Sequence, residues 1–167
     1  RISVDQIEVS FLGSFPYLSA VFHNVTIWSS HNFNREEFRN VDVERLFTAE
    51  KVYLKFNALD LIRSNIRIRR IYAVNGEANI LIDSQGRTNS QVLKPRTEKL
   101  KSKDKKIKEF ELEALKISNF NISFNNISKK TFSSSKVENL LLKGKFSKNK
   151  FSLGTRTSFI LEDFTRN

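Results

Sequence analysis

Few residues of this 167-residue chain have the types and the spacing that catalysis requires. The two histidines, His23 and His31, have no metal-ligand partner at a recognised spacing, and we interpret both as structural residues. The carboxylates at 36–37 and at 42–44 lie among basic residues, as they do on a solvated face. An acid/base pair at these carboxylates stays an open alternative, although nothing in their spacing favours it.

Other kinds of chemistry are missing from the sequence altogether. The chain has no cysteine, which removes thiol nucleophiles and Cys-ligated zinc. The five glycines are scattered singly, so no glycine-rich phosphate loop is present, and no serine has a nucleophile-elbow context. We therefore expect a protein that is not an enzyme and that has no catalytic residues, no metal and no cofactor.

The positive charge of the chain is concentrated in one segment. The net charge is +11, and residues 94–108 alone carry eight basic and two acidic side chains. A segment with so few apolar residues is typical of a solvated linker, with contact to anionic lipid head groups or nucleic acid as the alternative. The sequence thus predicts a β-region over 1–93, a basic linker or loop over 94–108, and a continuation of the sheet over 109–167.

Short stretches in which apolar and polar residues alternate predict the strands on both sides of this linker. Residues 2–11 and 17–28 are predicted to form a hairpin, and further strands are predicted at 52–56, 66–71 and 78–82. The alternation slips at 23–24 and at 69–70, and a slip of this kind indicates a β-bulge. Similar alternation recurs at 110–124, 137–146 and 150–161.

Turns and helices are predicted from capping and turn residues. Asn75-Gly76 predicts a type I′ hairpin turn between two strands, because both positions of that turn need φ > 0. Ser84-Gln85-Gly86 predicts a second turn. Asn57 is placed to cap a short helix at 60–62, and residues 35–46 favour another short helix. The predicted fold is mainly β: a strongly curled antiparallel sheet that forms a groove, with one or two short helices.

The order of these features from residue 60 to residue 89 resembles the N-terminal region of the AsmA-like family of Gram-negative envelope proteins, whose relatives include TamB. That region has an apolar pair, a small-residue turn, an isoleucine-rich strand, a second strand and an Asp-x-x-Gly-x-x-Asn turn. Here these are Leu61-Ile62, Ser64-Asn65, 66–71, 79–82 and 83–89. Residues 15–27 and 49–56 fit the preceding strands, so the resemblance covers about residues 2–90.

The resemblance implies a lipid-handling function. AsmA-like proteins are similar to the chorein-type, bridge-like lipid transfer proteins, in which a curled sheet encloses a hydrophobic trough for acyl chains. It implies a periplasmic module that is anchored in the inner membrane by a transmembrane helix upstream of Arg1. It also implies phospholipid transport between the inner and outer membranes in outer-membrane biogenesis, with phospholipid acyl chains and outer-membrane assembly proteins as partners.

Inward-facing apolar residues of the predicted strands are the candidates for the wall of this groove. The fifteen phenylalanines bring large apolar area without a polar atom, which suits acyl chains. The structural alternative is that the same residues form a closed hydrophobic core. The predicted groove residues are Val52, Leu54, Phe56, Ile66, Ile68, Ile80, Ile82, Phe110, Leu112, Ile122 and Phe124.

Two other kinds of function stay open from the sequence. A basic β-domain that binds nucleic acid would use Arg63, Arg67, Arg69 and Arg70, but the aromatic residues fall mostly on the apolar phase and no binding motif is present. We therefore expect no nucleic acid as partner. A structural envelope domain would instead contact a partner protein through an exposed sheet edge.

Overall fold

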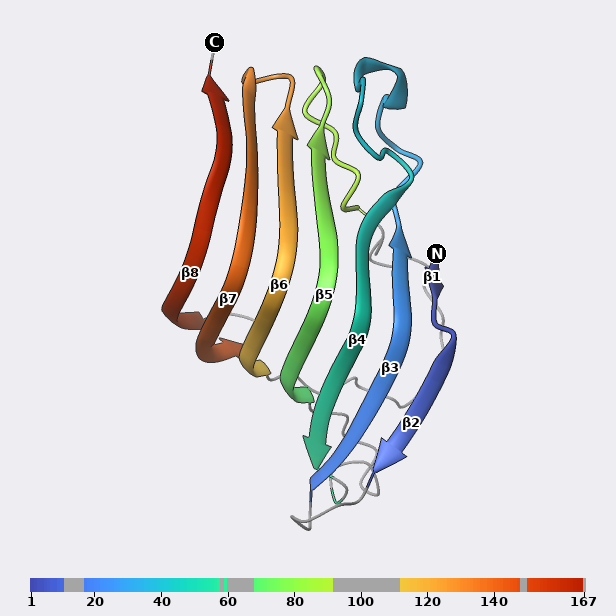
Figure 1. Cartoon of the computed structure of the whole chain (residues 1–167), viewed down its shortest axis with the longest axis vertical. Coiled ribbons are helices and arrows are strands. Elements are labelled where there is room, and N and C mark those ends of the chain that lie inside the picture. Colours follow the sequence, from blue (N-terminus) through green and yellow to red (C-terminus); the bar gives the residue numbers. More distant parts are fainter. Residues whose placement is uncertain (11–16, 58, 60–67, 92–111, 148–149, 167) are drawn as a thin grey trace, which may run out of the picture.

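The computed structural model describes residues 1–10, 17–57, 59, 68–91, 112–147 and 150–166. The predicted fold class is confirmed as mainly β, because these residues form one eight-stranded sheet and almost no helix (Figure 1). The strand order is β1-β3-β4-β5-β6-β7-β8, and β2 also pairs with β3. The strands are β1 (Ile2–Ser3), β2 (Gln6–Ser10), β3 (Tyr17–Trp28), β4 (Arg45–Asn57), β5 (Ile68–Ile82), β6 (Leu112–Asn126), β7 (Thr131–Ser147) and β8 (Lys150–Arg166).

The sheet is mixed rather than purely antiparallel. Every pair of neighbouring strands is antiparallel except β5 and β6, which run parallel. A parallel pair needs a long crossover, which here spans residues 83–111, and local alternation cannot reveal it. The sheet is also not strongly curled, so the prediction of a strong curl is wrong (Figure 1).

A row of polar residues crosses the middle of the sheet at one level. We call it the asparagine row, and it consists of Asn24, Glu50, Asn75, Asn119 and Glu138, one residue each from β3 to β7. The three asparagines have left-handed backbones, with φ of 50°, 54° and 55°. Asn75 Nδ2 donates to Glu50 Oε2 at 2.6 Å, and Asn119 Nδ2 donates to Asn75 Oδ1 at 2.8 Å. Asparagine accepts this conformation more readily than other residues with a Cβ atom.

The asparagine row inverts the pleat of every strand that it crosses. Phe22 and Val25 flank the row in β3 and face the same side, as do Ala73 and Gly76 in β5, although each pair is three residues apart. The inversion keeps one apolar face along strands of 12 to 17 residues. Residues from both sides of the row accordingly pack in one cluster: Ala49, Ala73, Phe120 and Val137, with Phe47, Val52, Ile117, Ile122 and Leu140 against them.

The prediction of a hairpin turn at Asn75-Gly76 is wrong. Both residues lie inside the single strand β5, and of the two only Asn75 has a positive φ. Gly76 is needed for a different reason, since a Cβ atom there would lie 2.0 Å from the Thr48 carbonyl oxygen and 2.7 Å from the Phe120 ring. Because β4 and β6 pair with β5 on both sides of this point, the chain is held straight where an isolated Asn-Gly would turn.

One of the two predicted bulges is confirmed, and the one at 23–24 is wrong, because the register between β3 and β4 continues through Asn24 without a shift. The register between β4 and β5 shifts next to Phe56 and Ile68, which places a bulge at Arg69, and the slip at 23–24 is the pleat inversion at Asn24. The predicted pairing of β2 with β3 is also present, from Gln6 opposite His23 onward.

Helix is scarcer than predicted. Only one 3-10 turn, η1 (Arg35–Glu37), forms in the stretch 35–46, and β4 already begins at Arg45. The Asn34 side chain caps η1 by accepting a hydrogen bond from the Glu36 backbone N–H. Asn57 Oδ1 accepts from the Leu59 N–H at 2.9 Å, as the predicted cap requires. The rest of the helix at 60–62 and the linker at 94–108 lie outside the described residues.

Candidate functional site

Eight of the eleven predicted groove residues can be placed, and all eight lie on the apolar face of the sheet and are half-buried. They are Val52, Leu54, Phe56, Ile68, Ile80, Ile82, Ile122 and Phe124. Ile66 and Phe110 lie outside the described residues. Leu112 begins β6, and its side chain is likewise outside the description. The structure therefore gathers these residues on one surface, as the alternation predicts.

Cross-strand pairing brings apolar residues from distant parts of the chain together on this face. Leu54 lies opposite Ile71, and Ile80 of β5 lies opposite Phe124 of β6. The centre of the face is a stacked pair of rings, Phe47 and Phe120, with centroids 5.5 Å apart. The sequence prediction missed both, although Phe120 belongs to the same alternating run as Phe124.

Two hollows in the described part of the molecule lie at polar sites. One hollow lies beside the end of β3, and its lining residues are Arg1, Trp28, Ser29, Ser30, His31, Asn32, Arg35, Glu44 and Gln91. Another lies over the asparagine row, with Arg45, Thr48, Asn75, Gly76, Glu77, Asn119 and Asn121 around it. These hollows do not test a groove along the apolar face, which stays a prediction.

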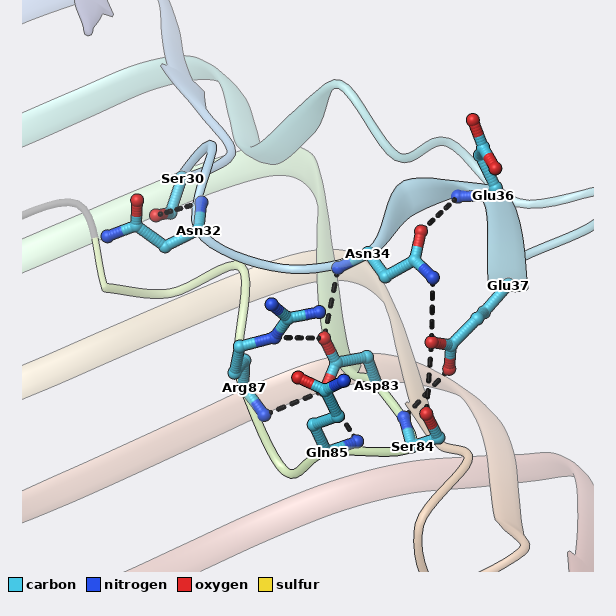
Figure 2. A network of polar contacts seen from close by, with 9 residues as sticks. All are labelled: Ser30, Asn32, Asn34, Glu36, Glu37, Asp83, Ser84, Gln85 and Arg87. Carbon is cyan, nitrogen blue, oxygen red and sulfur yellow. Dashed lines mark hydrogen bonds and ion pairs between the residues drawn. The ribbon is translucent and has the colours of Figure 1, made fainter.

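The turn that follows β5 is organised around the buried carboxylate of Asp83, whose side chain is fully inaccessible to solvent (Figure 2). Its Oδ1 accepts from the N–H groups of Gln85 at 3.0 Å and Arg87 at 2.8 Å. Its Oδ2 accepts from the N–H of Asn34 at 3.0 Å and from Arg87 Nε at 2.7 Å. Gly86, with φ of 76°, allows the chain to close around the carboxylate.

These four hydrogen bonds also determine the protonation state of Asp83. Burial alone would raise the pKa of the carboxyl group. The N–H groups of Asn34 and Arg87 and the Arg87 guanidinium outweigh burial, so the pKa of Asp83 lies below its ordinary value. The carboxylate is charged and fully engaged, which makes it a structural anchor rather than an acid or base for catalysis.

Asn89 and Glu37 tie the same turn to the segment that follows β3. Buried Asn89 accepts from the Leu81 N–H at 3.0 Å and donates to the Asn79 carbonyl at 2.7 Å. Glu37 of η1 accepts from both the N–H and the hydroxyl of Ser84, at 2.7 and 3.0 Å. The predicted turn at 84–86 is thus present, and its Asp and Asn clamp two segments about 50 residues apart.

The residues considered for catalysis are used in local contacts. His23 Nε2 lies 3.3 Å from Glu8 Oε1, and His31 Nδ1 lies 3.2 Å from an Arg35 guanidinium nitrogen. Asp42 accepts from the N–H groups of Glu44 and Arg45 and from the Arg45 guanidinium; these bonds lower its pKa although burial opposes them. The contact of His23 links β2 to β3, and those of His31 and Asp42 lie within loops.

The described ranges contain no group of three or more His, Cys, Asp or Glu residues arranged to hold a metal ion. Within the same ranges, no helix has the length and apolar character that crossing a bilayer requires. No protein-family model matches the chain, and comparison with curated proteins and with solved structures finds no match.

Proposed function

We propose that this chain is a non-catalytic, AsmA-like lipid-handling module whose apolar sheet face binds phospholipid acyl chains. The observation that carries the proposal is the continuity of that face. Residues from β3 to β7 contribute to it on both sides of the asparagine row. Among the elements whose bounds the structure describes, no helix or second sheet lies against it, since η1 contacts Ser84 just after β5.

The physical reason is the hydrophobic effect. An amphipathic sheet must bury its apolar face against something, and each acyl CH₂ group that leaves water contributes about 0.8 kcal/mol. Aliphatic and aromatic side chains along the face present no polar atom that fixes a lipid at one position. A bound chain would therefore gain similar free energy at successive positions, which suits passage along the sheet.

The cellular setting is part of the same proposal and is supported by the resemblance of residues 2–90 to AsmA-like proteins. The module would work in the periplasm of a Gram-negative bacterium, held at the inner membrane by a segment upstream of Arg1. It would take part in phospholipid transport to the outer membrane, alongside outer-membrane assembly proteins.

Lipid extraction tests the proposal directly. The protein is purified without detergent and the bound lipid is measured by mass spectrometry, for the wild type and for Leu54→Asn and Ile80→Asn. Glu77→Asn is the control, because Glu77 is exposed, lies three residues before Ile80 in β5 and is on the opposite face. We expect phospholipid with the wild type and the control, and less with the other two at unchanged circular dichroism. A wild type without lipid would overturn the proposal.

A structural domain that binds a partner protein at its edge is favoured by one observation. The edge strand β8 exposes Ile160, Leu161 and Phe164, with 52–57% of each side chain accessible. Unpaired edges accept further strands. Pull-down with wild type and Ser158→Pro, which removes a backbone donor from β8, separates this function from lipid binding: only partner capture should be lost.

A further inference from the structure

The polar face of the sheet carries a dense group of cations on one side of the asparagine row. Three successive cross-strand rows lie between the asparagine row and the end of the sheet where β3 begins, and we call them the basic rows. The row next to the asparagine row consists, from β3 to β8, of His23, Lys51, Val74, Ser118, Asn139 and Ser158. The middle row consists of Val21, Tyr53, Tyr72, Lys116, Leu141 and Arg156. The outer row consists of Ser19, Lys55, Arg70, Ala114, Lys143 and Gly154.

Within these six strands the basic rows contain cations and no carboxylate, and Glu8 of β2, which lies opposite Val21 at the edge of the sheet, is 3.3 Å from His23. Lys51, Lys55, Arg70, Lys116, Lys143 and Arg156 supply six positive charges. Within the described part of the chain, Lys51 has only a long contact of 3.8 Å with Glu50 of the asparagine row, and the other five have no ion pair. Because neighbouring strands are about 4.8 Å apart, these charges repel one another unless an anion compensates them.

Tyrosine rings contact two cations of the basic rows, Lys55 and Lys116, and also the neighbouring Arg69. Lys116 Nζ lies 4.8 Å from the centre of the Tyr72 ring, and Tyr72 stacks on Tyr53 with centroids 5.5 Å apart. Lys55 and Arg69 both lie over the Tyr17 ring, at 5.4 and 5.3 Å.

Arg69 also donates to the Tyr17 hydroxyl at 3.1 Å. Lys55 and Lys116 are therefore positioned in advance, and the rings of Tyr17 and Tyr72 have cations over them. A tyrosine covered in this way is not free to stack on a nucleic-acid base, which argues against single-stranded nucleic acid as the partner.

We propose that the basic rows are a docking surface for an anionic phospholipid membrane, whose head-group phosphates the lysines and arginines contact. The cations are spread over five strands, β4 to β8, of a sheet that is not strongly curled, and none of the described hollows is lined by them. A broad surface of this kind fits an extended anionic plane. Tyrosine, apolar along its ring and polar at its tip, is suited to a membrane–water interface.

The other half of the same face explains why docking would involve one end of the sheet. Beyond the asparagine row, the next cross-strand row contains Glu77 opposite Asn121 and then Lys136, and the row after it ends in Asp163 of β8. Positive and negative charges are mixed there, so that half has little attraction for an anionic plane. The apolar face points away from the docked membrane and stays available whether or not it binds acyl chains.

Vesicle co-sedimentation tests the docking surface. The probes are phosphatidylcholine vesicles with and without phosphatidylglycerol, and the variant is the triple change Lys55→Gln, Arg70→Gln and Lys116→Gln. A basic residue near an anionic bilayer contributes roughly fivefold in affinity, so the triple variant should lose on the order of a hundredfold. The matched control removes three positive charges outside the basic rows, through Lys129→Gln, Lys130→Gln and Lys136→Gln. Both triple variants keep the basic segment 94–108 unchanged.

The outcomes separate the alternatives. The proposal expects binding only with phosphatidylglycerol, a fall in binding as salt is added, and a much larger loss in the first triple variant than in the control. An equal loss in both would overturn it, because net charge alone would then explain binding. Binding to a single-stranded oligonucleotide but not to vesicles would replace it with nucleic acid. Lipid that co-purifies with the first triple variant reports on the apolar face alone, so the two proposals can fail independently.

Discussion

Asparagine and glycine occur together once inside β5 and once in the turn that follows it, and the path of the chain differs between these two places. At Asn75-Gly76 the left-handed asparagine lies inside a continuous strand and inverts its pleat. At 83–89 the left-handed Gly86 closes a turn around a buried carboxylate. Both stretches carry the same local turn signal, so the surroundings decide which outcome occurs. Paired strands hold the first one extended, and a carboxylate that collects backbone donors folds the second.

The difference also determines what each glycine does. Gly76 is required by close packing, because a Cβ atom would collide with the Thr48 carbonyl oxygen and the Phe120 ring. Gly86 is required by its backbone angle alone, because a Cβ atom there would have no neighbour within 4 Å. One site depends on the whole sheet and the other on its own turn.

Gly76→Ala should have the largest effect and would break the first site. The Cβ atom would lie 2.0 Å from a backbone oxygen that two strands hold in place, so we expect the free energy of unfolding to fall by more than about 4 kcal/mol, or the fold to be lost. Gly86→Ala is the matched control and should cost only about 1 kcal/mol, from its positive φ. Urea denaturation measures both, and similar losses would contradict the distinction.

Asp83→Ala should remove the second site with the next largest effect. The N–H groups of Asn34, Gln85 and Arg87 would lose their acceptor in a buried place, which we expect to cost about 3 kcal/mol. The exposed Asp163 on β8 is the control, and Asp163→Ala should change stability by less than about 0.5 kcal/mol. If the two alanine variants unfold at the same urea concentration, the Asp83 turn does not hold the loop.

Acid pH should sharpen the same comparison. The pKa of Asp83 is lowered in the folded chain, while an aspartate in an unfolded chain titrates near about 3.9. Its contribution to stability is therefore complete above that pH and is lost as the pH falls through the lower folded pKa. Unfolding free energies measured from neutral to acid pH should fall less steeply for Asp83→Asn than for the wild type. Parallel curves would mean that Asp83 is not the titrating group.

Substitutions of Asn75 test the asparagine row with the smallest expected effect. Asn75→Ala loses the hydrogen bonds to Glu50 and from Asn119 and places an ordinary residue at φ of 54°, for a total of about 2 kcal/mol. Asn75→Gly loses the same bonds but accepts the backbone angle, so it should be about 1 kcal/mol more stable than the alanine variant. Alanine and glycine variants of equal stability would show that the left-handed backbone is not the constraint.

The sequence predicted well whatever depends on neighbouring residues. Period-2 alternation located the strands, and the slips at 23–24 and 69–70 correspond to the inversion at Asn24 and the bulge at Arg69. The sequence prediction failed for two features that depend on pairing between distant residues. These are the parallel pairing of β5 with β6 and the extended backbone of β5 through Asn75-Gly76. The Asp-x-x-Gly-x-x-Asn spacing indicated the turn.

The partners of that turn could not be read from its own sequence. Asn34 and Glu37 contact it from 47 to 49 residues away, and no local spacing relates them to Asp83 and Ser84. For the candidate site, alternation assigned residues to the correct face. It could not assign the curvature of the sheet, because curvature depends on how all strands twist together. The slip at 23–24 belongs to a pleat inversion that crosses β3–β7 at one level, so it is not a separate bulge that adds curl.

Face-specific crosslinking tests the central claim, acyl-chain binding by the apolar face, most directly. A photoreactive amino acid is placed at Leu54 or Ile80 on the apolar face, and at Glu77 or Asn79 on the polar face outside the basic rows. Irradiation with phospholipid present, followed by mass spectrometry, should give lipid adducts at positions 54 and 80 and few at 77 and 79. Adducts of equal yield on both faces, or none at 54 and 80, would contradict the claim.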